Sequence, residues 1–332
     1  MHIPDGVLDP KVAAAAGAVA VAGLGFGLKR LEKHLGERTT VLMGVMSAFV
    51  FAAQMVNFPV ALGVSGHLLG GVLAAVLLGP WAGAVVIGAV LIVQCLLFGD
   101  GGLTALGANF VNMGLIGAVG GYAIYAPLRR AIGGRTGVLV GAMVAAWFAV
   151  LLASGAFAIE LAASGRRSDF LRILSWMTLV HSAIGVGEAV ITGLVLRFVL
   201  LTRPDLVYEP EDVEPSRAAR GWQVAAGGLA VALAVAVFLA PFASISPDGL
   251  EFVGTKLGFL NEEAAPLVAA PLADYELPLP GLKQTRVATA LVGVLGTLVV
   301  FTAGMGLARV FSGRGRDRGT AERPAEVSPH AA

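Results

Sequence analysis

The sequence predicts an all-α integral membrane protein, and three observations lead to this fold class. Of the 332 residues, 57% are hydrophobic and only 14% are charged. The mean hydropathy of +0.82 leaves too little polar surface to cover a water-soluble globule of this length. The third observation is a series of apolar stretches long enough to cross the hydrocarbon core of a bilayer. A lipid bilayer is therefore the expected environment of the chain, and nothing indicates a nucleic-acid partner.

Each apolar stretch is expected to form one membrane-spanning helix. The nine stretches cover residues 12–28, 41–57, 67–79, 81–98, 103–126, 137–159, 173–201, 222–242 and 287–308. Most of the 23 Lys and Arg residues lie in segments that an outside N-terminus would place inside the cell. The positive-inside rule therefore predicts an N-terminus outside and a C-terminus inside, which agrees with an odd number of spans.

The segment before the first span does not have the pattern of a cleavable signal peptide. Asp5, Asp9 and Lys11 precede the apolar stretch, whereas a secretory signal opens with a basic region. The bulky His2 is a poor substrate for removal of the initiator methionine. We therefore expect Met1 to be the mature N-terminus.

Met1 and His2 together offer three adjacent nitrogen donors to a metal ion: the free α-amine, the His2 backbone nitrogen and the His2 imidazole. A fourth donor would complete a planar site, a geometry that suits Ni(II) and Cu(II) and that low-spin Co(II) accepts. Zn(II) prefers a tetrahedron, and Mg²⁺ and Ca²⁺ prefer oxygen ligands. Residues 4–6, Pro-Asp-Gly, form a turn signature that would fold the terminus back toward the bundle. The alternative is an ordinary histidine at a frayed terminus.

The third stretch, residues 67–79, is too short to span the membrane alone. The apolar residues 58–66 before it are expected to enter the protein as irregular backbone, which is tolerated at membrane depth only where it is packed in protein or lines a cavity. A cavity is therefore predicted next to His67, which opens the third helix. A single histidine on an apolar helix is more often a packed core residue than a ligand, although ionisable residues inside membranes are often functional.

Polar residues near these histidines are candidates for orienting them. The glycine-rich outside loop 96–114 is either only a tight connection or a source of carboxylate and amide groups that orient the imidazoles by hydrogen bonds. The candidates for this supporting role are Asn57, Ser65, Asp100 and Asn109.

His181 and Glu188 share one face of the seventh predicted helix, because they lie seven residues apart. An acid and a base inside a membrane raise the possibility of a metallohydrolase. The spacing is not H-E-x-x-H, however, and no third ligand lies nearby in the sequence. We interpret them as a buried polar pair that fixes or couples packed helices, and we assign no catalytic residue.

The chain divides into two membrane parts. The first seven spans lie in residues 1–202, and the polar residues 203–221 form a predicted cytoplasmic linker. Residues 222–310 form a two-helix hairpin whose outside loop covers residues 243–286. Residues 311–332 are charged and rich in glycine, which predicts a disordered cytoplasmic tail in which His330 has no role.

Several motifs occur in order along the first part: MHIPDG, AAQMVNFPVALGVSGHLLGG, GPWAG, QCLLFGDGGLTALGANFVNMG and HSAIGVGEAVITG. Together they resemble the CbiM/NikM family, the substrate-binding S component of cobalt/nickel energy-coupling-factor (ECF) transporters. The resemblance covers roughly residues 1–202. SPDGLEFVGTKLGF and PLADYELP in the second part resemble the PDGLE domain, which is similar to the small auxiliary membrane subunit CbiN/NikN. The two appear fused in this chain.

The resemblance implies a metal site and a set of partners. In that family the ion is held by the N-terminal amine, the backbone nitrogen and imidazole of the second residue, and the histidine of the SGHLLGG motif. These groups belong to Met1, His2 and His67 here. Co(II) or Ni(II) is then the transported substrate, with no bound catalytic cofactor. The implied partners are a transmembrane coupling (T) subunit and two cytoplasmic ATPase (A) subunits, in the cell membrane of a prokaryote.

The sequence leaves the ion and part of the role open. No G-x-x-x-x-G-K-[ST] motif occurs, so the chain is expected to be a transporter subunit without its own ATPase site. The sequence does not distinguish cobalt from nickel, since the same four nitrogens serve both ions. Co(II) for cobalamin supply is slightly preferred, and Ni(II) for urease or hydrogenase supply is the alternative. A membrane metal sensor that does not transport is the alternative of another class. The acidic residues of loop 243–286 outnumber its basic ones, which predicts a role in guiding cations or in loading.

Overall fold

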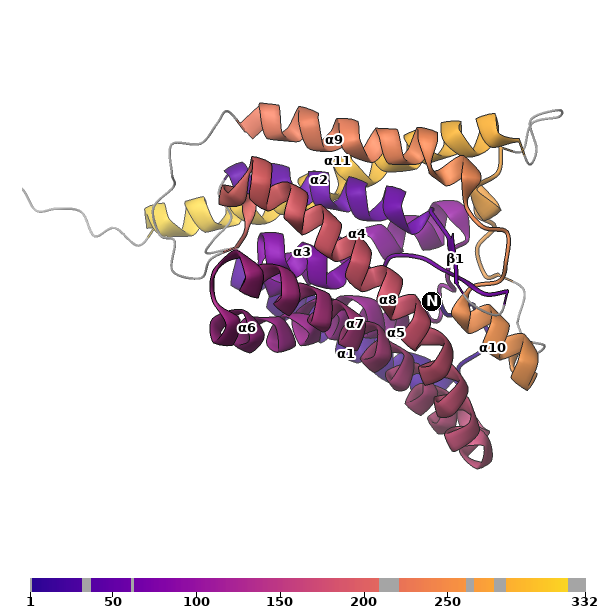
Figure 1. Cartoon of the computed structure of the whole chain (residues 1–332). Coiled ribbons are helices and arrows are strands. Elements are labelled where there is room, and N and C mark those ends of the chain that lie inside the picture. Colours follow the sequence, from indigo (N-terminus) through magenta and orange to yellow (C-terminus); the bar gives the residue numbers. More distant parts are fainter. Residues whose placement is uncertain are drawn as a thin grey trace, which may run out of the picture.

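The computed structural model describes residues 2–31, 37–60, 63–208, 221–260, 266–277 and 285–321. Within these residues the chain is a bundle of helices with a single pair of two-residue strands (Figure 1). The segments long and apolar enough to cross a membrane are Pro10–Leu31, Pro80–Phe98, Leu106–Ile132, Gly134–Thr202, Gln223–Phe242 and Arg286–Phe311, and a shorter apolar helix covers Arg38–Gln54. The protein is therefore a multi-pass helical membrane protein.

The first part of the chain consists of helices joined by short turns. Its helices are α1 (Pro10–Leu31), α2 (Glu37–Gln54), α3 (Gly71–Leu78), α4 (Pro80–Val93), α5 (Leu106–Asn109), α6 (Gly121–Ile132), α7 (Gly134–Leu161) and α8 (Phe170–Thr202). The π-helical segment η1 (Gln94–Phe98) extends α4, and η2 (Phe110–Gly120) joins α5 to α6. The turns η3 (Ala162–Arg166) and η4 (Arg167–Asp169) connect α7 to α8, and η5 (Pro204–Leu206) follows α8. In the described chain, a helix lies at each apolar stretch that the sequence indicates.

The segment before α3 is irregular, as the short third stretch predicts. Strands β1 (Phe58–Pro59) and β2 (Ser65–Gly66) pair antiparallel, with Phe58 opposite Gly66. His67 follows β2 directly and lies outside any helix, which corrects the expectation that it opens α3. The helix begins only at Gly71, because Gly70 has a left-handed φ of 77° and the backbone N–H groups of Leu69 and Gly70 bond to a side chain of α8.

The second part consists of α9 (Gly221–Phe238), η6 (Ala240–Phe242), α10 (Gly249–Leu257), η8 (Ala273–Tyr275) and α11 (Arg286–Ala321). Helices α9 and α11 run beside α2 (Figure 1). Small residues allow this packing: a Cβ on Gly44 of α2 would lie 3.0 Å from the backbone oxygen of Phe301.

The last helix is longer than its apolar stretch. The sequence predicts disorder from residue 311, but α11 continues to Ala321, and no proline interrupts it before Pro324. Residues 322–332, with His330, lie outside the described residues, as do residues 209–220 of the predicted linker.

The segment between α9 and α11 folds over the end of the bundle where the chain begins (Figure 1). Ser244 N donates to the Asn57 carbonyl oxygen at 2.7 Å, and Ser65 N donates to the Pro247 oxygen at 2.9 Å. Leu272 N donates to the Leu97 oxygen at 2.9 Å. The second part of the chain is thus hydrogen-bonded to the loops that surround the N-terminus.

Candidate metal centre

The N-terminal segment is held in the bundle by the glycine-rich loop. Ile3 is 1% exposed, and its N–H donates to Asn109 Oδ1 at 2.8 Å. Its carbonyl oxygen accepts bonds from Asn109 Nδ2 at 3.1 Å and from Gly102 N at 2.8 Å. These bonds fix the chain immediately after His2, so the described terminus is anchored rather than frayed.

Asp5 anchors the turn that follows. Its Oδ1 accepts bonds from Thr104 N at 2.8 Å and Thr104 Oγ1 at 2.6 Å, and its Oδ2 accepts from Leu267 N at 3.3 Å. Burial raises the pKa of the carboxyl, but these hydrogen bonds outweigh it and lower the pKa below the ordinary value. An ionised Asp5 therefore ties the N-terminal turn both to the glycine-rich loop and to the second part of the chain.

Two imidazoles meet at the N-terminus. The His2 and His67 rings stack with centroids 5.1 Å apart and planes 19° apart. Each side chain is 7% exposed. His2 Nδ1 lies 3.0 Å from Asp100 Oδ1, and His2 Nε2 is buried with no hydrogen-bond partner in the described part of the chain. The structure thus brings together the two histidines that the motifs single out.

The tautomer of His67 is set by its own loop. Nδ1 lies 3.1 Å from the Leu68 carbonyl oxygen, which can only accept, so Nδ1 carries the hydrogen and Nε2 carries a lone pair. Histidines that bind metals usually donate their second N–H to a carbonyl or a carboxylate in this way. His67 Nε2 is therefore arranged as a donor to an ion.

Asp100 connects His2 to the second part of the chain. Its Oδ2 accepts the Tyr275 hydroxyl at 2.7 Å, and the Tyr275 ring stacks on Phe98 with centroids 4.8 Å apart. Burial raises the pKa of the Asp100 carboxyl, but the His2 charge and the hydrogen bonds from His2 and Tyr275 lower it below its usual range. An ionised Asp100 can orient the His2 ring.

Asp248 places a second carboxylate beside His67. It is the N-cap of α10 in a capping box, with Oδ1 accepting from Glu251 N at 2.8 Å and Asp248 N donating to Glu251 Oε2 at 2.9 Å. Its Oδ2 lies 3.8 Å from His67 Nε2. Burial raises the pKa of Asp248, but the charges and donors around it, including His67, lower it below its usual range. The sequence reasoning missed Asp248 and Tyr275 here, although both lie in the quoted SPDGLE and PLADYELP motifs.

The other sequence-predicted residues have different positions. Asn109 supports Ile3 rather than an imidazole. Ser65 Oγ donates to the Ser246 carbonyl oxygen at 2.7 Å and so binds the second part of the chain. The Asn57 carbonyl accepts from Ser244, while its side-chain oxygen is buried without a partner in the described residues.

His181 and Glu188 are both buried on α8, but they are not bonded to each other. Glu188 accepts two bonds from the loop that carries His67, from Leu69 N at 2.6 Å and Gly70 N at 2.9 Å. His181 Nδ1 instead lies 2.9 Å from the Met177 oxygen. The two residues therefore do not act as a pair: Glu188 holds the His67 loop, whereas the bond of His181 stays within α8.

Among the described residues, no three His, Cys, Asp or Glu side chains converge at distances that suit a metal ion. With the side chains in these positions, an ion held between His2 and His67 therefore needs further donors other than carboxylates, thiolates or a third imidazole. Main-chain nitrogens at the start of the chain fit this requirement, because they are adjacent to the His2 imidazole.

Replacing Glu188 with glutamine should loosen the His67 loop. Glutamine offers one acceptor where two buried N–H groups need partners, and a buried donor left unpaired costs about 1–3 kcal/mol. We expect a lower unfolding temperature in detergent and a loss of metal affinity of about 10- to 100-fold, as for other groups that orient ligands. Glu160→Gln is the matched control, since Glu160 on α7 accepts from Asn112 and not from the His67 loop. Equal metal affinity of the Glu188→Gln protein and this control would exclude the orienting role.

The chain is similar to known metal transporters over most of its length. The family described as "Cobalt uptake substrate-specific transmembrane region" (CbiM) matches residues 2–206, and the PDGLE domain matches residues 222–313. A putative fused nickel transport protein NikMN of Archaeoglobus fulgidus is 36% identical over 312 residues, covering 93% of this chain and 98% of that protein. The cobalt transport protein CbiM of Geobacter sulfurreducens is 32% identical over 219 residues, covering 62% of this chain and 61% of that protein.

A solved structure is also similar. The crystal structure of a truncated transition metal transporter matches with a TM-score of 0.55 and 33% identity. The match covers 60% of this chain and 99% of that one.

Proposed function

Because the chain belongs to the CbiM family of cobalt-uptake transmembrane proteins and carries a PDGLE domain after it, we propose that it binds Co(II) or Ni(II) at the outer side of the membrane and delivers the ion inward. The observation that carries this proposal is the pair of stacked imidazoles of His2 and His67, whose side chains are each only 7% exposed, at an anchored N-terminus. A cobalt or nickel site at that place explains why two imidazoles are buried together in an apolar bundle.

The donors we propose are the Met1 amine, the His2 backbone nitrogen, the His2 imidazole and His67 Nε2. Met1 lies outside the described residues, but its amine is one peptide unit from the His2 nitrogen by covalent geometry. The chelate ring that includes the His2 backbone closes through Nδ1, because Nε2 is too far from its own main chain. In the structure Nδ1 faces Asp100, so the ring must turn about its Cβ–Cγ bond when the chelate forms.

This donor set selects the ion by geometry. Deprotonating a backbone amide is costly near neutral pH, and an oxophilic ion gains too little from nitrogen ligands to offset that cost. Ni(II) and Co(II) both suit four planar nitrogens. The relative from Archaeoglobus fulgidus, which matches both parts of this chain, is named for nickel, and this weighs against a preference for cobalt.

Transport requires subunits other than this chain. We propose that it is the S component of an ECF importer in the cytoplasmic membrane of a prokaryote, with an outside N-terminus, seven spans before the linker and two after it. A transmembrane coupling subunit and two cytoplasmic ATPases would supply the movement and the energy, since the sequence has no phosphate-binding loop. Reconstitution tests this: proteoliposomes that hold the chain with these partners should take up labelled ion only with ATP. ATP-independent uptake by the chain alone, or none with all partners, would contradict the proposal.

The second part of the chain is proposed to act in loading. Deleting residues 222–332 should lower uptake of labelled nickel or cobalt, because Asp248 then no longer lies beside His67 and Tyr275 no longer donates to Asp100 beside His2. Equilibrium binding of the ion by residues 1–202 should survive. Equal uptake by the truncated and full-length proteins, at equal membrane insertion, would show that the PDGLE part has no role in loading.

A further inference from the structure

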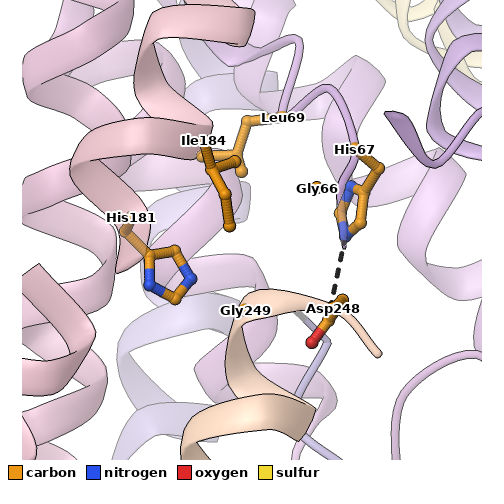
Figure 2. A pocket seen from close by; sticks show the side chains of 7 residues that line it. All are labelled: Gly66, His67, Leu69, His181, Ile184, Asp248 and Gly249. Carbon is orange, nitrogen blue, oxygen red and sulfur yellow. Dashed lines mark ion pairs between the residues drawn. The ribbon is translucent and has the colours of Figure 1, made fainter. Parts of the chain in front are cut away.

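A small cavity lies beside the candidate metal centre, between α8, α10 and the loop after β2 (Figure 2). Its volume is about 10 Å³, close to the least that admits a single water molecule. Its polar lining consists of His67, His181 and Asp248. The cavity can therefore hold one water molecule or one small ion.

Glycine brings α10 close enough to α8 to close this cavity. A Cβ on Gly249 would lie 3.0 Å from His181 Nε2 and 2.6 Å from Ile184 Cδ1. Any side chain at position 249 would push α10, and with it Asp248, away from α8. The close approach places the outside-loop carboxylate within the same small space as the His181 ring.

His181 has a buried nitrogen without a partner. The side chain is 1% exposed, and its Nδ1 donates to the Met177 carbonyl oxygen at 2.9 Å, so Nε2 carries the lone pair. That nitrogen has no hydrogen-bond partner among the residues the structure describes. Figure 2 shows the His181 ring directed across the cavity toward the side where His67 and Asp248 lie. Buried polar atoms are normally satisfied, so an acceptor facing a cavity indicates an occupant.

The two imidazoles that line the cavity have the same tautomer. His67 and His181 each donate Nδ1–H to a backbone carbonyl and each leave Nε2 as a lone pair. A carbonyl partner on the second nitrogen is typical of metal-binding histidines. The 3.8 Å between His67 Nε2 and Asp248 Oδ2 exceeds a hydrogen bond, yet two ligand bonds of about 2.0–2.2 Å to a shared ion would span it.

We propose that this cavity is a second, transient site for the divalent cation, in which His181 Nε2 and Asp248 Oδ2 are ligands and His67 Nε2 is shared with the planar site. The proposal rests on the proposed function. Carboxylate and imidazole ligands suit first-row divalent ions that still carry water, and Asp248 belongs to the outside loop from which the ion arrives. Side-chain shifts must draw the three ligands together around the ion, because in the described structure no three such groups converge at distances that suit a metal ion. The cavity holds the ion until the His2 amide is deprotonated and the planar chelate closes.

The test uses the full-length protein with His2→Gln, in which the planar chelate cannot form and Met1 is retained. Purified in detergent and titrated with Co(II), it should bind about one equivalent of high-spin Co(II) with a visible spectrum of nitrogen and oxygen ligands. Adding His181→Gln or Asp248→Asn should weaken this binding by about 10-fold or more. Thr192→Val is the matched control, because Thr192 is also fully buried on α8 with an unpartnered side-chain oxygen, but does not line the cavity.

A second variant tests the cavity without removing a ligand, in case His181→Gln or Asp248→Asn misfolds. Gly249→Ala keeps all three ligands but inserts a methyl group against His181 and Ile184, so it should weaken Co(II) binding in the His2→Gln protein as well. Absence of Co(II) binding by the His2→Gln protein would overturn the second site. Binding that neither His181→Gln nor Gly249→Ala weakens would overturn it as well.

The association and dissociation rates of Ni(II) distinguish failure of this proposal from failure of the proposed function. With His2 intact, His181→Gln should slow both association and dissociation of Ni(II) by a common factor, which leaves the equilibrium affinity unchanged. Unchanged rates would refute the transient role while the planar site stands. Failure of the unmodified protein to bind Ni(II) or Co(II) at all would refute the proposed function, and it would do so independently of the His2→Gln titration.

Discussion

Replacing His67 with alanine is expected to remove high-affinity binding of Ni(II) and Co(II). The variant leaves a three-nitrogen site open to water, and it leaves the Asp248 carboxylate facing a gap where the imidazole stood. The loss should exceed the roughly 10- to 100-fold that follows removal of a group that only orients a ligand. Isothermal titration calorimetry on the purified full-length protein measures it.

The His67→Ala experiment has a matched histidine control in the same chain. His330 lies near the C-terminal end, outside the described residues, and His330→Ala should bind both ions like the unmodified protein. An unchanged dissociation constant for the His67→Ala protein would remove His67 from the site.

Blocking the N-terminus should have an equally large effect without altering any side chain. If the amine and the His2 backbone nitrogen form fused chelate rings, one glycine added before Met1 places an amide where the amine must bind. A chain with histidine third brings four nitrogens of its own, which leaves no vacancy for His67. Ile3 is fixed to Asn109 and Gly102, so the longer terminus cannot slide into a new register.

Either the added glycine or acetylation of the amine should therefore abolish binding in the site that includes His67, and uptake with it, with membrane insertion unaffected. A glycine added after Ala332 is the control for chain extension and should change neither. Uptake assays with labelled nickel or cobalt, together with a binding isotherm, provide the measurements. If His2 were an ordinary histidine in a terminal segment, blocking the N-terminus would have no effect. Full transport by a chain with a blocked N-terminus would therefore exclude the chelate.

Much of the fold follows from local sequence. Composition and apolar length place a helix at each predicted stretch, because a bilayer requires every backbone polar group to be satisfied within the segment. The shortness of residues 67–79 correctly predicts irregular backbone and a cavity beside His67. The prediction that α3 begins at His67 is wrong. The start of this helix depends on a hydrogen bond from Leu69 N to Glu188, and these two residues lie 119 positions apart in the chain.

The candidate site was predictable only in part, for the same reason. The motifs identify His2 and His67, and the structure brings their rings together. From the second part of the chain, Asp248 comes to lie beside His67 and Tyr275 bonds to Asp100 beside His2, over sequence separations that no local pattern encodes. Tyr275, for example, donates to Asp100 across 175 residues. The fused domain is thereby hydrogen-bonded to groups beside both imidazoles, an arrangement that composition and spacing cannot show.

The coordination of the bound ion tests the four-nitrogen assignment most directly. X-ray absorption spectroscopy and magnetic susceptibility on the full-length protein loaded with Ni(II) would report the donors and the geometry together. Four nitrogen donors in a plane make Ni(II) diamagnetic, and this is the result we predict from Met1, His2 and His67. A paramagnetic, six-coordinate Ni(II) with oxygen ligands would contradict it.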